Sequence, residues 1–170
     1  MNLPNTLTLF RLFLIPVFIL TFFSKIPNSF VYSVMIFLIA GATDILDGFI
    51  ARKYNLITKW GVLFDPFADK LMLIAVLACL VIGGYIPLWV LIVIAVKESI
   101  MISGGIVLFS HGTVIPSNLL GKITTFLFYT AVFTLIFNDN LGRYLMYLAV
   151  GSAVAASVNY YLLFRHSKAA

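Results

Sequence analysis

Six long apolar stretches, separated by short polar breaks, dominate the hydropathy of this chain. They cover residues 7–24, 30–50, 61–82, 87–109, 118–137 and 142–164, and each break between them carries Gly, Pro or Asn. The apolar runs are continuous and do not alternate in the manner of strands, which favours helices. About 20 apolar residues are enough for a helix to cross a bilayer. The pattern therefore predicts an all-α, polytopic membrane protein with six transmembrane helices.

The composition agrees with a membrane location. Hydrophobic residues make up 62% of the 170 residues and charged residues only 10%, whereas soluble domains are about 45–50% apolar. Six helices leave no room for a separate soluble domain, so we expect residues 1–170 to form a single membrane domain. The net charge of +5 needs no nucleic-acid partner, because basic residues at helix ends lie beside anionic lipid.

The positions of Lys and Arg predict the orientation of the chain in the lipid bilayer. If the N-terminus is cytoplasmic, the basic residues of that side are Arg11, Arg52, Lys53, Lys59, Arg165 and Lys168. The opposite side then has only Lys25 and Arg143. Because Lys and Arg are enriched in cytoplasmic segments, we expect both termini, and the loop after the second stretch, to face the cytoplasm.

Four of the six acidic residues fall in one window around this loop. Asp44 and Asp47 are spaced i, i+3, and Asp65 and Asp69 are spaced i, i+4, so each pair lies on one face of its predicted helix. A carboxylate at bilayer depth costs about 2.5–3.5 kcal/mol unless a counter-charge is present. Mg²⁺ and Mn²⁺ prefer oxygen ligands and often share them with phosphates. The window therefore predicts a site for two divalent ions at the cytosolic face.

Small and basic residues lie between the aspartates. Gly48 and Ala51 permit close approach of a ligand or a neighbouring helix, Arg52 is suited to bind a phosphate, and Gly61 precedes Asp65 by one turn. Helix packing is the alternative role for the small residues. The alternative function is a cation or proton transporter that uses the acidic residues as an ion path. Against it, the aspartates cluster at one face of the membrane, and across the rest of the bilayer only Glu98 is acidic.

The fixed positions of this window are Asp44-x2-Asp47-Gly48-x2-Ala51-Arg52-x8-Gly61-x3-Asp65-x3-Asp69. This spacing resembles the full signature of the CDP-alcohol phosphatidyltransferase family, and the six apolar stretches are similar too. The resemblance implies transfer of a phosphatidyl group from a CDP-linked lipid to an alcohol, with release of CMP. It implies that the four aspartates bind two Mg²⁺ or Mn²⁺ ions and that Asp69 is also the base. The residues implied to bind the CDP-lipid are Gly48, Ala51, Arg52, Thr58 and Gly61.

Two further segments resemble particular branches of the family. The run from Asp65 to Lys70 and the opening from Pro4 to Arg11 are similar to members whose acceptor is glycerol 3-phosphate or phosphatidylglycerol. In those members Asn5 and Thr8 would contact the nucleotide. An equally good alternative is that Asn5 and Thr8 are only an N-cap and a first-turn residue of the helix that follows Pro4.

An acceptor phosphate requires cations, and the candidates are Lys97 and Lys122. The alternative for Lys97 is an ion pair with Glu98, although adjacent positions do not face each other on a helix. The alternative for Lys122 is to extend to the membrane interface. Members that use glycerol 3-phosphate usually have Arg where this chain has Lys97, a further Arg where it has Gly104-Gly105, and Gln where it has Phe128. The acceptor pocket of this chain is therefore less cationic than theirs.

We expect CDP-diacylglycerol as donor and glycerol 3-phosphate as acceptor. Phosphatidylglycerol, which would give cardiolipin, is the alternative acceptor. The resemblance also implies a homodimer, and we expect the protein in the inner (plasma) membrane of the cell.

Overall fold

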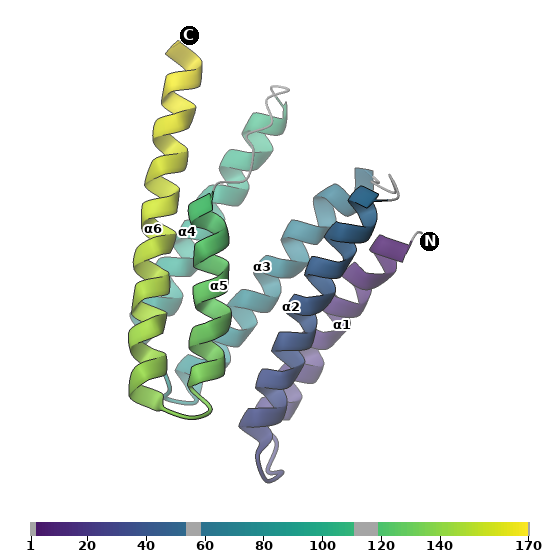
Figure 1. Ribbon diagram of the computed structural model, residues 1–170, viewed down its shortest axis with the longest axis vertical. Coiled ribbons are helices and arrows are strands. Elements are labelled where there is room, and N and C mark those ends of the chain that lie inside the picture. Colours follow the sequence, from purple (N-terminus) through teal and green to yellow (C-terminus); the bar gives the residue numbers. More distant parts are fainter. Residues whose placement is uncertain (1–2, 54–58, 111–118, 170) are drawn as a thin grey trace. The chain divides into compact units, whose positions relative to one another are not determined.

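The computed structural model describes residues 3–53, 59–110 and 119–169, and within these ranges it contains helices and no strand (Figure 1). The helices are α1 (Leu3–Phe22), α2 (Ser29–Lys53), α3 (Lys59–Ile82), α4 (Leu88–Ser110), α5 (Leu119–Thr134) and α6 (Asp139–Ala169). The chain divides into two units, Met1–Gly83 with α1–α3 and Gly84–Ala170 with α4–α6. The all-α prediction is confirmed for the described ranges.

In the first unit, α1 packs against both α2 and α3. The core is built from apolar side chains such as Phe18, Phe37 and Met72, which are at most 2% exposed. At the turn between α1 and α2, the rings of Phe22 and Phe30 meet edge to face, with centroids 6.0 Å apart. Asn28 takes a φ of 60° there, a conformation that Asn tolerates better than most residues. The turn therefore holds α1 and α2 as antiparallel neighbours.

In the second unit, α6 packs along α5 and also contacts α4. The α5–α6 turn is tight because Gly142 lies against it: a Cβ atom at this position would be 2.6 Å from Leu135 Cδ2 and 2.9 Å from the Leu135 nitrogen. Asn138 caps α6, since its Oδ1 accepts a hydrogen bond of 3.0 Å from the Leu141 amide. Hydropathy had predicted that α5 extends to residue 137 and that α6 begins at 142. The structure ends α5 at Thr134, because the apolar residues 135–137 belong to the turn, and it begins α6 at Asp139, because polar residues form the start of this helix.

Arg143 of α6 fixes the turn that precedes α4. Its Nε donates to the Tyr85 carbonyl at 2.6 Å, and its Nη2 donates to the Gly84 carbonyl at 3.3 Å. Gly84 has a φ of 76°, which is the left-handed region that favours glycine. Burial raises the pKa of Tyr85, and the nearby Asp139 carboxylate raises it further. This phenol therefore stays neutral at physiological pH.

Two helical segments in the described part of the chain are long and apolar enough to cross a membrane, Ser29–Ile50 and Asp139–Asn159. A shorter apolar helix covers Thr6–Phe22. Large hydrophobic side chains are exposed in both units, among them Leu20 at 73% and Phe126 at 70%. Extended apolar surface is rare on soluble monomers, so this exposed surface fits a membrane protein. Six transmembrane helices remain a prediction beyond the two segments.

Candidate metal and substrate site

The acidic window is anchored by an ion pair between two helices of the first unit. Asp44 lies in α2 with its side chain 40% exposed, and its Oδ1 is 2.7 Å from Nη1 of Arg11 in α1. Arg11 itself is only 1% exposed. One edge of the Asp44 carboxylate is therefore held by a buried guanidinium, while the residue remains open to solvent.

The other three aspartates lie on α2 and α3. Asp69 lies in α3 and is partly exposed. Asp47 and Asp65 belong to α2 and α3, but their side chains lie outside the described residues. Because both segments are helical, the i, i+3 and i, i+4 spacings place each pair one turn apart, and α2 contacts α3. The two helices that carry the aspartates are thus neighbours.

The described groups fit a hard divalent cation. Asp44 and Asp69 offer carboxylate oxygens, which suit Mg²⁺ or Mn²⁺, and both are accessible. No group of three or more His, Cys, Asp or Glu side chains occurs among the described residues, a set that excludes the side chains of Asp47 and Asp65. Convergence of four carboxylates on two ions therefore stays a prediction.

Two of the residues expected to bind the CDP-lipid have described surroundings. Thr8 is 4% exposed and lies one turn before Arg11 on α1. Gly48 is half-buried, one turn after Asp44 on α2. The other expected residues are Asn5, Ala51, Arg52, Thr58 and Gly61, and their side chains or whole positions lie outside the described residues. The nucleotide contacts therefore stay predictions.

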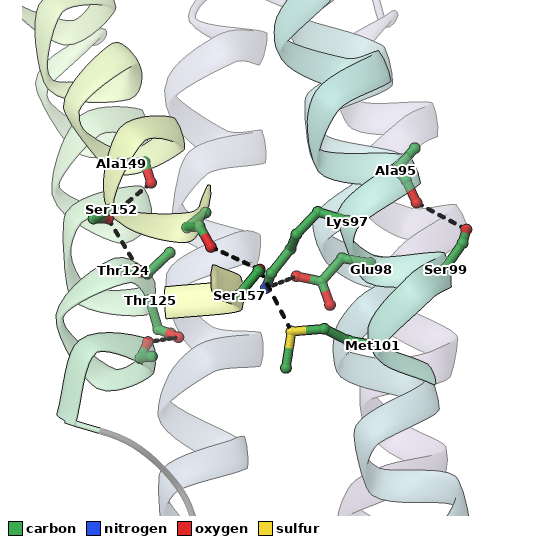
Figure 2. A network of polar contacts seen from close by, with 12 residues as sticks. Ala95, Lys97, Glu98, Ser99, Met101, Thr124, Thr125, Ala149, Ser152 and Ser157 are labelled. Atoms are coloured by element: carbon green, nitrogen blue, oxygen red, sulfur yellow. Dashed lines mark hydrogen bonds and ion pairs between the residues drawn. The ribbon is translucent and has the colours of Figure 1, made fainter. Parts of the chain in front are cut away.

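Lys97 and Glu98 form an ion pair within α4 (Figure 2). The Lys97 Nζ lies 2.7 Å from Glu98 Oε1, and the two side chains are 13% and 6% exposed. Adjacent helical positions do not usually face each other, but the long Lys side chain spans the difference. The ion pair weighed as an alternative for Lys97 is thus present. Because Glu98 compensates the charge of Lys97, acceptor binding by Lys97 stays a prediction.

Lys122 differs from Lys97 because it is exposed, near the start of α5. No hydrogen bond or ion pair in the described part of the chain defines its role. Both of its expected roles, acceptor binding and extension to the interface, stay open. The aspartates belong to the first unit and both lysines to the second, so an acceptor subsite beside the metals is also a prediction.

Hydroxyl groups that the sequence reasoning missed link the helices of the second unit. Thr124 of α5 and Ser152 of α6 are hydrogen-bonded at 3.0 Å, and Ser157 of α6 contacts the Met101 sulfur of α4 at 4.0 Å (Figure 2). Met101 follows Lys97 by one helical turn, so Lys97 lies on the side of α4 that faces α6. The sequence could have indicated these contacts, because Ser and Thr within apolar helices often form hydrogen bonds between helices in membranes.

The family can be decided by comparison with known proteins. A model of the CDP-alcohol phosphatidyltransferase family matches residues 1–155. The chain belongs to this family. It is an enzyme of the phosphatidyltransferase class, and its apolar helices fit a family that acts on lipid. Every fixed position of the acidic window named above lies inside the matched residues.

Several curated relatives are named CDP-diacylglycerol–glycerol-3-phosphate 3-phosphatidyltransferase. The Bacillus subtilis protein is 37% identical over 150 residues, which cover 81% of this chain and 78% of the relative. The Rickettsia bellii protein is 32% identical over 169 residues, covering 94% and 93%. The Escherichia coli protein is 44% identical over 89 residues, covering 52% and 48%. The phosphatidyltransferase similarity thus extends along nearly the whole chain.

Proposed function

We propose that this protein transfers a phosphatidyl group from CDP-diacylglycerol to glycerol 3-phosphate. The products are phosphatidylglycerophosphate and CMP. The observation that carries the proposal is the complete acidic signature in a chain that is 32% identical, over 94% of its length, to a relative bearing that name. A cation or proton transporter is disfavoured, because the family and the relatives' names indicate a transferase.

In this reaction the acceptor hydroxyl oxygen forms a bond to the phosphorus that carries the diacylglycerol. The bond from that phosphorus to the CMP oxygen breaks, and CMP leaves with the electron pair. Asp69 accepts the proton of the attacking hydroxyl and passes it to solvent or to the departing phosphate. Its position on α3, partly exposed, supports this role. Removal of the proton makes the hydroxyl oxygen a better nucleophile.

The four aspartates Asp44, Asp47, Asp65 and Asp69 are the proposed ligands of two Mg²⁺ or Mn²⁺ ions. When bound, such ions neutralise a pyrophosphate and stabilise both the attacking and the leaving oxygen. The described pair Arg11–Asp44 supports the ligand assignment, because it holds one of these carboxylates at a partly exposed position.

The residues proposed to bind the two substrates are those expected from the sequence. The residues that contact the CDP-lipid are the signature residues Gly48, Ala51, Arg52 and Gly61, together with Asn5, Thr8 and Thr58. Lys97 and Lys122 bind the acceptor phosphate, and the low exposure of Lys97 supports a strong interaction there, since water screens it little. Residues 1–170 are proposed to act as one catalytic domain.

The proposal also includes how the chain crosses the membrane and which side the site faces. We place six helices across the inner (plasma) membrane, with the aspartates at the cytoplasmic face, where a water-soluble acceptor can enter and CMP can leave. The distribution of Lys and Arg supports this orientation. A homodimer is proposed from the family resemblance.

A panel of acceptors tests the proposed function. Purified protein receives CDP-diacylglycerol with glycerol 3-phosphate, phosphatidylglycerol, serine or inositol in parallel, and CMP release is measured. We expect CMP release to be fastest with glycerol 3-phosphate. Release with phosphatidylglycerol alone would assign cardiolipin synthesis instead, and release with serine or inositol alone would move the chain to another branch of the family.

A further inference from the structure

A buried arginine lies on the face of α1 that packs against the rest of the first unit. Arg11 is 1% exposed, and Thr8, Leu14 and Phe18 on the same side of α1 are exposed by 4%, 8% and 1%. These positions are spaced by about one or two helical turns. The guanidinium is therefore part of the interior of the α1–α3 unit, and does not serve as a flanking charge for lipid headgroups.

One contact of Arg11 is with a proposed metal ligand. Its Nη1 lies 2.7 Å from Oδ1 of Asp44, across the interface of α1 and α2. Buried ion pairs contribute little to stability, and apolar residues of similar volume often pack as well or better. Packing of α1 on α2 alone does not explain a charged pair at this position. Its location beside the acidic window gives it a role at the metal site.

We propose that Arg11 is a positioning residue that orients the Asp44 carboxylate for metal binding. The inference rests on the proposed function, because it takes Asp44 as a ligand. A carboxylate held at one oxygen has a fixed direction for the other, so less ordering is required when a cation binds. The Arg11–Asp44 contact is an ion pair, and loss of such an outer partner of a metal ligand typically changes metal affinity by about 10- to 100-fold.

Electrostatic repulsion between Arg11 and the metal ion would change the metal affinity in the opposite direction, so measuring this affinity tests the inference. The guanidinium repels a nearby cation, and an ion that needs both oxygens of Asp44 must displace it. In that case loss of Arg11 would strengthen metal binding. We infer that orientation outweighs repulsion, because the carboxylate between the two positive groups offsets much of the charge of Arg11.

Direct titration with Mn²⁺ distinguishes the two effects without any substrate. Detergent-purified protein is titrated against Mn²⁺, and the EPR signal of the free ion gives the Kd. We expect Arg11→Gln to raise the Kd by about 10- to 100-fold. Arg11→Lys, which keeps the buried charge and is less prone to misfold, should raise the Kd by a smaller factor, because an ammonium does not reproduce the planar guanidinium.

The matched control is Phe18→Ala, which removes a side chain buried to the same extent on the same helix. It lowers thermal stability but leaves the Kd of the folded protein for Mn²⁺ unchanged. A Kd that is unchanged or lower in either Arg11 variant overturns the inference. An equal loss of affinity in Phe18→Ala also overturns it, because the effect would then be structural.

A double-mutant cycle tests whether Arg11 acts through Asp44. Asp44→Asn should weaken Mn²⁺ binding, and adding Arg11→Gln to it should cause no further loss. An additive loss would contradict the proposal. Since no acceptor is present, failure of the glycerol 3-phosphate assignment leaves this result unaffected, whereas a wild-type protein that does not bind Mn²⁺ overturns both the metal site and the inference.

Discussion

Replacing Lys97 with methionine should weaken binding of the acceptor while donor binding is retained. The Lys97 side chain is 13% exposed and its Nζ lies 2.7 Å from Glu98 Oε1. Methionine preserves much of the length and apolar surface of the side chain but removes the charge. If Lys97 binds the phosphate of glycerol 3-phosphate, the lost charge affects that substrate and not CDP-diacylglycerol.

The magnitude follows from the surroundings of the ammonium. A hydrogen bond that involves a charged group contributes about 1.5–3 kcal/mol, which corresponds to about 10- to 150-fold in affinity. Removing one partner of a buried ion pair also destabilises the fold, by about 3–5 kcal/mol. Lys97→Met should therefore raise the KM for glycerol 3-phosphate and lower the apparent Tm.

Steady-state kinetics in mixed micelles separate these effects. KM is measured for each substrate while the other is saturating, and the folded fraction is followed by size-exclusion chromatography. The double variant Lys97→Met with Glu98→Gln removes both charges, so it should recover stability without recovering acceptor affinity. Lys97→Arg keeps the charge and should keep the KM for glycerol 3-phosphate near the wild-type value.

Two outcomes would refute the role of Lys97. One is a Lys97→Met variant whose KM for glycerol 3-phosphate stays within about twofold of wild type, a difference worth less than one hydrogen bond. The other is an equal rise in both KM values, which would indicate general damage to the site. A loss of stability alone would assign the Lys97–Glu98 pair to folding.

Three further predictions concern the base, the metal and the helix packing. Asp69→Asn should lower kcat by at least about 10²–10⁴-fold in the CMP assay while the protein stays monodisperse, and substantial turnover would exclude Asp69 as base. EDTA should stop CMP release and Mg²⁺ or Mn²⁺ should restore it, whereas activity insensitive to chelators contradicts a metal mechanism. Gly142→Ala should lower the Tm because its Cβ would meet Leu135 at 2.6 Å, while Gly151→Ala, with nothing within 4 Å, should not.

Hydropathy predicted the helices well because an apolar run must satisfy its backbone hydrogen bonds internally. It predicted their ends less well at α5 and α6. Asn138 and Asp139 are polar, yet Asn138 caps α6 and Asp139 begins it. Caps use polar residues for hydrogen bonds that the helix itself cannot make, so a hydropathy boundary falls inside the helix.

The candidate site was predictable where chemistry depends on spacing and less so where it depends on contacts between helices. The spacing of Asp44 and Asp47 on a helix follows from the sequence alone. The pairing of Arg11 with Asp44 does not, because it depends on how α1 packs against α2. Arg11 entered the sequence reasoning only as a charge near a membrane surface. A basic residue inside an apolar run, one turn after Thr8, was the signal for a buried partner.

The side chains of the second unit illustrate the same limit. Helical geometry argued against a contact between Lys97 and Glu98, yet their long side chains meet at 2.7 Å. Backbone spacing predicts where Cβ atoms point, but a Lys side chain with four rotatable bonds can bend towards a buried carboxylate. Pairing of such residues therefore has to be observed in a structure.

The central claim is metal-dependent transfer of a phosphatidyl group to glycerol 3-phosphate, and the lipid product tests it most directly. Purified protein in micelles is given CDP-diacylglycerol, radiolabelled glycerol 3-phosphate and Mg²⁺, and both labelled lipid and CMP are quantified. We predict equal amounts of the two products, identification of the lipid as phosphatidylglycerophosphate by mass spectrometry, and at least about 10²-fold less of both products from Asp69→Asn. CMP release without labelled lipid, or labelled lipid formed in EDTA, would contradict the account.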